Sequence, residues 1–169
     1  KDLDNIKILW SSSTVVYGEE KTYSKNQADE KSVLSPSTYY GLTKVLAEEI
    51  SNYFSREYKM NITGLRLPIV IGPGLEYRGV TSGISDMAKA SSVKKPIKVD
   101  MPDTPLDIIY VKDVAEIFIN MINSKFPLKS IYNSPCYRTY ADKIAKQFNK
   151  ESKISCIKVN NIGTGATYP

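Results

Sequence analysis

The sequence has no histidine and only two cysteines among its 169 residues. Zinc sites in proteins are built largely from cysteine and histidine. Cys136 and Cys156 lie too far apart for a Cys-x-x-Cys motif, so we expect no zinc site and no other metal centre. Two thiols without a pairing motif are typical of a reducing compartment, and we expect a cytoplasmic protein.

Long apolar runs are also missing. No run approaches the about 18 residues that a membrane-spanning helix needs, so we expect no membrane partner. The net charge is +5, but the basic residues are scattered, with Lys94, Lys95 and Lys98 as the one tight group. No aromatic side chains alternate with them, so we expect no nucleic-acid partner either.

A glycine-rich turn is the third absence. A dinucleotide-binding fold places such a turn after its first strand, where backbone amides meet the pyrophosphate. Two glycine pairs occur, at 72–74 and 163–165. The first contains Pro73 and follows a late strand, and the second is close to the end of the sequence. Neither pair has the spacing of the turn.

What the sequence does contain is an alternation of strand-like and helix-like segments. Short apolar runs predict strands, and 3.6-residue periodicity predicts helices. Alternating elements of these two kinds indicate an α/β fold with a mainly parallel sheet. Residues 19–38 have no periodicity and are expected to form a loop over the site, and residues 72–105 are expected to shape the substrate side. The predicted strands are 6–11, 62–71, 106–111, 130–133 and 154–159, and the predicted helices are 39–58, 82–92, 113–124 and 140–149.

Two segments contain residues suited to proton transfer. Residues 11–18 (SSSTVVYG) follow an apolar strand, so that Ser13 would lie at its carboxyl end, where parallel sheets bind ligands. Tyr40 and Lys44 begin the helix predicted at 39–58 and share one of its faces. A lysine beside a phenol favours the phenolate, which can accept a proton. About one Tyr-x-x-x-Lys pair is expected by chance in this sequence, and a second pair starts at Tyr17, in a predicted loop.

Several segments, in order, resemble the extended short-chain dehydrogenase/reductase family, the NAD-dependent sugar epimerases and dehydratases. The resemblance implies a Rossmann-like fold with a small substrate-binding subdomain, and a Ser-Tyr-Lys site that transfers a hydride. Its segments are 11–18 (the serine strand), 40–48 (YGLTKVLAE, the catalytic helix), 64–68 (GLRLP) with 72–74 (GPG), 107–115 (DIIYVKDVA), and 132–133 (YN) with the following helix.

The resemblance implies roles for individual residues. Tyr40 would be the catalytic acid/base, Lys44 would bind the nicotinamide ribose, and Ser13 would bond the reacting oxygen. Ser11, Ser12 and Pro68 would line the cofactor together with Tyr40 and Lys44. Thr14 and Ile69 would contact the substrate together with Ser13. The cofactor would be NAD, or NADP, because the segment that selects between them is not recognisable here.

Departures from the family pattern bear on the substrate. Members that use nucleotide sugars carry an asparagine where this chain has Ile69 and a phosphate-binding arginine where it has Leu106. Leucine cannot replace the bidentate bonds of arginine. The smaller branch with threonine dehydrogenase and sugar-acid dehydrogenases lacks that arginine, so a dehydrogenase of this branch is an alternative to an epimerase. Thr14 and Val15 replace an Asp-Glu pair, which disfavours dehydration.

The missing glycine turn leads to a further expectation about the whole chain. By the resemblance, its sequence matches the carboxyl-terminal part of the family fold, with the first strands missing. Residues 1–71 would complete the dinucleotide domain, and 72–169 would be mostly substrate-binding, with 106–124 returning to the core. We expect a small-molecule substrate and a homodimer through the catalytic helix. A non-catalytic remnant used for binding or assembly is the alternative of another class.

Overall fold

The computed structural model describes residues 6–24, 27–74, 82–153, 156–163 and 165. The chain forms two compact units. The first contains residues 1–68, 112–135 and 168–169, and the second contains residues 69–111 and 136–167. The domain division expected from the sequence, at 71/72, stays a prediction. None of the helices in the described ranges combines the length and apolar character needed to cross a membrane.

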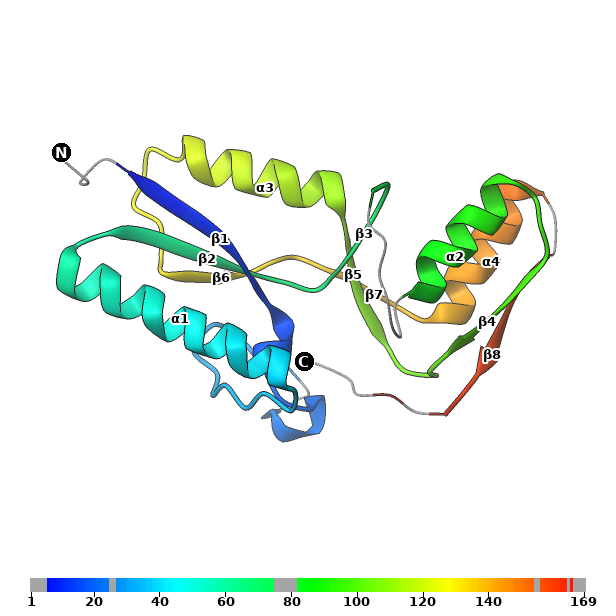
Figure 1. The fold of residues 1–169 in the computed structure, drawn as a ribbon, viewed down its shortest axis with the longest axis horizontal. Coiled ribbons are helices and arrows are strands. Elements are labelled where there is room, and N and C mark those ends of the chain that lie inside the picture. Colours follow the sequence, from blue (N-terminus) through cyan, green and yellow to red (C-terminus); the bar gives the residue numbers. More distant parts are fainter. Residues whose placement is uncertain (1–5, 25–26, 75–81, 154–155, 164, 166–169) are drawn as a thin grey trace. The chain divides into compact units, whose positions relative to one another are not determined.

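The first unit is built on a parallel sheet. Its strands are β1 (Lys7–Ser13), β2 (Asn61–Leu67) and β6 (Ile131–Asn133), in the order β1-β2-β6. In Figure 1, α1 (Tyr39–Tyr58) lies on one side of this sheet and α3 (Val111–Asn123) lies on the other. Two short 3-10 turns, η1 (Thr14–Val16) and η2 (Glu20–Thr22), follow β1. The β1-α1-β2 crossover brings the start of α1 to the carboxyl end of β1 (Figure 1).

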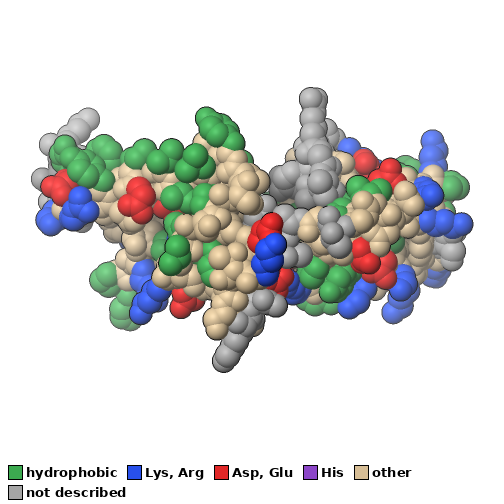
Figure 2. All heavy atoms as spheres, turned by 90° about the horizontal axis from the view of Figure 1, so that it is seen from below, with side chains coloured by type: hydrophobic (Ala, Val, Ile, Leu, Met, Phe, Trp, Pro, Cys, Tyr) green, Lys and Arg blue, Asp and Glu red, His purple; other side chains and the backbone are tan. Residues whose placement is uncertain are grey.

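The burial of α1 differs from that of a usual amphipathic helix. Its buried residues are Gly41 and the charged Glu48, while several of its large apolar side chains are exposed. A helix normally packs its apolar stripe on the core. Here the apolar stripe faces outward, and Figure 2 shows hydrophobic side chains in a row along this unit. The exposed side chains are Tyr39, Tyr40, Leu42, Leu46, Ile50, Tyr53, Phe54 and Tyr58.

The second unit combines two small sheets with two helices. Strands β3 (Ile69–Ile71), β5 (Leu106–Tyr110) and β7 (Tyr137–Thr139) form one sheet, and β4 (Ile97–Met101) pairs with β8 (Ile157–Asn161). The helices α2 (Ser82–Ser92) and α4 (Ala141–Ser152) pack on each other. Among the described strands, β5 and β7 pair antiparallel and the other pairings are parallel. The core of this unit is Ile84, Met87, Val99, Met101, Leu106, Ala141, Ala145 and Ile157.

The predicted α/β class with a mainly parallel sheet is confirmed, and the helices at 39–58 and 82–92 are found at those residues. The strand predicted at 62–71 is wrong as one element, because Pro68 has no amide hydrogen for a ladder and separates β2 from β3. The helix predicted from 113 begins at Val111, which places Asp113 in its first turn. Residues 154–155 of the last predicted strand lie outside the described residues.

Candidate active site

The carboxyl end of β1 meets the first turns of α1. Thr38 caps the helix, since its side chain accepts a hydrogen bond from the Gly41 amide at 3.0 Å. Lys44 Nζ donates to the main-chain oxygen of Ser11 at 2.8 Å and lies 5.6 Å from the centre of the Tyr40 ring. The structure therefore brings Ser11, Tyr40 and Lys44 together at the end of the strand. Tyr40 is about half exposed and so is accessible to a ligand.

The other predicted residues of this strand end differ in what they contact. Ser12 is buried, and its hydroxyl donates to Glu48 Oε1 at 2.5 Å. Ser13 is partly buried, and its Oγ accepts a bond from the Val15 amide at 3.4 Å, which caps η1. Thr14 is the first residue of η1. Ser12 thus faces the protein interior, while the Ser13 hydroxyl stays at the strand end.

A glycine allows α1 to start close to this strand end. A Cβ atom added at Gly41 would collide with the Val15 main-chain oxygen and would lie 2.9 Å from Pro36 Cβ. Any larger residue would separate the helix start from η1. Gly41 therefore allows Tyr40 and Lys44 to approach β1.

Pro68 and Ile69 fall on either side of the division between the units. Pro68 is buried at the end of the first unit, directly after β2. Ile69 begins β3 in the second unit and is partly buried. The position of Pro68 after a strand parallel to β1 places it at the same sheet end as Ser13.

A buried ion pair between Arg66 and Glu48 lies next to the carboxyl end of β1. Arg66 of β2 bonds Glu48 of α1 through Nε to Oε1 at 2.9 Å and through Nη2 to Oε2 at 2.6 Å. Their side chains are 3% and 6% exposed. Arg66 Nη1 also donates to the Tyr17 hydroxyl at 2.5 Å, and that hydroxyl lies 2.8 Å from Asn133 Oδ1. The network therefore links α1, β2, β6 and the residue that follows η1.

Burial affects the protonation of this network. Burial raises the pKa of the Tyr17 hydroxyl, although the Arg66 charge opposes the rise. Burial alone would lower the pKa of Arg66, but hydrogen bonds to Glu48 and its charge outweigh that effect, and the net direction is upward. Arg66 is therefore a permanent buried cation, and Tyr17 is a neutral donor and acceptor at physiological pH.

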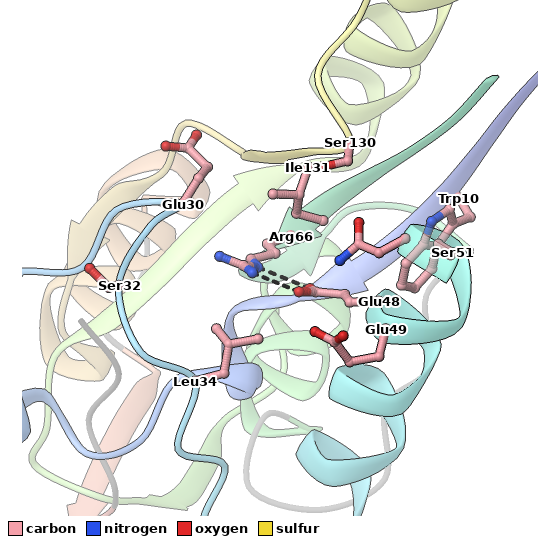
Figure 3. Close-up of a pocket in the computed structure, with 11 residues that line it drawn as sticks. Trp10, Glu30, Ser32, Leu34, Glu48, Glu49, Ser51, Arg66, Ser130 and Ile131 are labelled. Carbon is pink, nitrogen blue, oxygen red and sulfur yellow. Dashed lines mark hydrogen bonds and ion pairs between the residues drawn. The ribbon is translucent and has the colours of Figure 1, made fainter. Parts of the chain in front are cut away.

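A pocket of about 240 Å³ opens beside the ion pair (Figure 3). None of Ser13, Tyr40 and Lys44 lines it. Its two central charges, Glu48 and Arg66, already satisfy each other, so they offer little to a ligand. The pocket is therefore separate from the residues that the sequence predicted as catalytic, Ser13, Tyr40 and Lys44. The lining residues are Trp10, Glu30, Ser32, Leu34, Glu48, Glu49, Ser51, Asn52, Arg66, Ser130 and Ile131.

Tyr17, Glu48 and Arg66 were not predicted from the sequence as site residues. Two signals could have found them. Arg66 is a charge inside an apolar strand, and such a charge requires a buried partner. Glu48 follows Lys44 by four residues and therefore lies on the same face of the helix.

The parallel β1-β2-β6 sheet with α1 as its crossover helix defines a Rossmann-type α/β protein. The family model "NAD dependent epimerase/dehydratase family" matches residues 2–133. The chain belongs to this family, and the resemblance found in the sequence is confirmed.

A curated protein is similar in sequence, and two solved structures are similar in fold. UDP-glucuronate 4-epimerase 1 of Arabidopsis thaliana is 29% identical over 126 residues, which is 69% of this chain and 27% of the epimerase. L-threonine 3-dehydrogenase from Trypanosoma brucei has a similar fold, with a TM-score of 0.79 at 20% identity over 93% of this chain and 50% of that one. UDP-N-acetylglucosamine 4-epimerase from Bacillus cereus gives a TM-score of 0.78 at 19% identity over 97% and 55%.

The chain spans about a quarter of the length of the Arabidopsis epimerase and about half of the two solved structures. The residues present fit one end of a dinucleotide. A phenol and an ammonium group lie together near the carboxyl end of β1, and the Ser13 hydroxyl lies at the end of the same strand, where Rossmann-type sheets hold the nicotinamide. No glycine-rich turn for the pyrophosphate occurs in the sequence.

Proposed function

We propose that this chain is the catalytic part of an NAD(P)-dependent enzyme that interconverts a carbinol and a carbonyl on a sugar or small hydroxy compound. The observation that carries the proposal is the Lys44 ammonium held between the Ser11 carbonyl and the Tyr40 ring. The bond to Ser11 fixes a positive charge beside the Tyr40 ring, at the end of β1. The family's dependence on NAD supports the same reading.

Each residue has a role in proton transfer. Tyr40 Oη takes the proton of the substrate hydroxyl during oxidation and returns it during reduction. Lys44 lies beside the Tyr40 ring and offers its remaining N–H groups to the ribose. The Ser13 hydroxyl bonds the reacting oxygen and orients it toward Tyr40. The nicotinamide, when bound, accepts and donates the hydride.

An epimerase and a dehydrogenase differ in the step after oxidation. An epimerase returns the hydride to the opposite face of the same carbon, whereas a dehydrogenase releases the carbonyl product. The curated relatives are UDP-sugar epimerases. Ile69 and Leu106, which cannot bind phosphate, favour the dehydrogenase instead. Epimerisation of a sugar and oxidation of threonine or a sugar acid are therefore the two candidate reactions.

The decisive test of the proposal is Tyr40→Phe in the product of the complete gene, with Tyr39→Phe as the matched control. The neighbouring Tyr39 is exposed and begins the same helix. We expect Tyr40→Phe to lower kcat about 10²-fold or more without lowering the midpoint of thermal unfolding, because only the acid/base hydroxyl is lost. The control should keep the parent kcat. Equal turnover in all three proteins would refute the role of Tyr40, whereas no turnover in the parent would favour the non-catalytic alternative.

Ligand-induced stabilisation separates the substrates. A ligand at 100 times its Kd raises the free energy of unfolding by about 2.7 kcal/mol. The melting temperature of the complete protein should be measured with NAD plus a UDP-sugar, threonine or a sugar acid. A rise with threonine or a sugar acid supports the dehydrogenase, and a rise with the UDP-sugar supports the epimerase.

A further inference from the structure

The end of β1 is bonded to α1 at two successive turns of the helix. Lys44 binds the carbonyl of Ser11, and Glu48, four residues later, accepts the hydroxyl of Ser12. The two bonds act on consecutive residues of one strand and on one face of one helix. Together they fix both the rotation of α1 and its position along its own axis.

Glu48 is held rigidly from the opposite side. Both of its carboxylate oxygens bind Arg66 in the bidentate geometry that restricts orientation most strongly. Arg66 in turn bonds Tyr17, whose hydroxyl reaches Asn133 of β6. The carboxylate that receives Ser12 is therefore fixed by β2 and β6 and cannot follow movements of the helix alone.

Apolar packing does little to fix this helix. Leu46 and Ile50 are 53% and 58% exposed, and the residues of α1 that are buried are Gly41 and Glu48. The position of α1 on the sheet therefore depends on polar bonds. Lys44 and Tyr40 lie one and two turns before Glu48. A shift of α1 at Glu48 therefore moves both of them.

We propose that Glu48 is a positioning residue for the Tyr40–Lys44 pair, fixed by Arg66 and bonded to Ser12 so that Lys44 meets the Ser11 carbonyl and Tyr40 stands at the end of β1. This inference rests on the proposed function. Catalytic groups must be held within a fraction of an ångström, and a misplacement of about 1 Å costs about 10²-fold in rate. Glu48 acts through α1 and touches no reacting atom.

The first test replaces the ion pair by apolar side chains in the complete protein. Such replacements commonly leave stability unchanged, whereas single replacements strand a buried charge. Glu48→Leu with Arg66→Met should keep the melting temperature within a few degrees of the parent, lower kcat about 10²-fold and weaken NAD+ binding. Parent-like kcat and NAD+ affinity in this folded double variant would show that the pair only stabilises the fold. Glu49→Gln, an exposed neighbour, is the control and should match the parent.

Ser12→Ala is the second test and decides the matter if the double variant does not fold. It leaves the Glu48–Arg66 pair intact and removes the bond between Glu48 and β1. We expect a lower kcat, an unchanged KM for the carbinol substrate and an almost unchanged melting temperature. A Ser12→Ala protein with the parent kcat would overturn the proposal.

A double-mutant cycle on NAD+ affinity, measured by calorimetry, separates this inference from the proposed function. Lys44→Met should weaken NAD+ binding. If Glu48 acts by placing Lys44, adding Glu48→Leu and Arg66→Met to Lys44→Met should cause no further loss. Additive losses would overturn the positioning role alone. No effect of Lys44→Met would instead mean that the proposed cofactor site is wrong, and the positioning role would fail with it.

Discussion

Tyr17 is the residue on which several bonds of the buried network converge. Its hydroxyl accepts from Arg66 at 2.5 Å and lies 2.8 Å from Asn133 Oδ1 and 2.9 Å from the main-chain oxygen of Asp29. Tyr17 as a whole is 1% exposed. A hydroxyl with these neighbours must stay protonated to donate while it accepts. Its protonation therefore contributes to the stability of the first unit.

We predict a dependence of stability on alkaline pH that comes from Tyr17. Burial raises its folded-state pKa above 10.0, so the unfolded chain releases this proton first as the pH rises. The stabilisation is complete below about pH 10 and is lost at higher pH. At pH 8, Tyr17→Phe should lower the free energy of unfolding by about 1–3 kcal/mol, because Arg66 and Asn133 lose a partner. The gap between the two proteins should narrow toward pH 11 in urea titrations.

A control for this prediction is Tyr23→Phe, since Tyr23 accepts from the Gly18 amide and donates to Val33 outside the ion-pair network. This variant keeps the bonds of Tyr17 to Arg66 and Asn133, so it should retain the parent's loss of stability toward pH 11. Parallel curves for the parent and Tyr17→Phe would contradict the prediction.

At the scale of elements, Gly41 sets how close α1 approaches the end of β1. Gly41→Ala would stabilise an isolated helix by about 1 kcal/mol. Here the added methyl group collides with the Val15 main-chain oxygen. We expect a net destabilisation of about 1–3 kcal/mol by overpacking, together with loss of activity, because the helix start must move. Asn52→Ala, at an exposed position of the same helix, should be neutral or slightly stabilising, as thermal unfolding of both variants can check.

Sequence patterns predicted some elements better than others. The bounds of α1 followed from its helical periodicity, and the helix predicted at 140–149 is found as α4, at Ala141–Ser152. The strand β4 was missed, although Ile97, Val99 and Met101 alternate with polar residues, because lysines and a proline surround it. The three-residue strand β7 is too short to give a periodic signal.

The sequence indicated only some residues of the candidate site, because local patterns do not show which distant residues pair. Residue type and spacing were enough to select Tyr40 and Lys44, which the structure places together. They were not enough for Glu48, because a glutamate in an amphipathic helix normally faces solvent. Its burial depends on Arg66, 18 residues away, and such pairing appears only after the strand and the helix are packed.

At the scale of the whole molecule, the exposed apolar side chains of α1 predict self-association. Leu46 and Ile50 lie one turn apart on this face. We expect the complete protein to be a homodimer through α1, because an apolar face of this kind is stable when it is covered. Leu46→Glu with Ile50→Glu should give monomers in sedimentation velocity. Ile119→Glu, at an equally exposed site on α3, is the control and should leave the dimer intact. If the variant with Leu46→Glu and Ile50→Glu is still a dimer, the interface lies elsewhere.

The absence of a glycine-rich turn leads to a prediction for the chain by itself. Contacts to the pyrophosphate provide much of the affinity for a dinucleotide, and these contacts need that turn. The 169-residue chain should therefore show no measurable NAD+ binding by calorimetry. Micromolar affinity in the 169-residue chain would mean that the strand end with Tyr40 and Lys44 is sufficient by itself.

The buried bond between Glu48 and Arg66 also constrains how this sequence can diverge. Loss of either partner leaves an uncompensated buried charge at a cost of about 3–5 kcal/mol, against a total stability of about 5–15 kcal/mol for a typical domain. Lineages that lose one charge are thus close to unfolding until the other changes as well. Positions 48 and 66 should therefore covary among homologous sequences. We expect the Glu-Arg pair to be either retained or replaced at both positions by apolar residues.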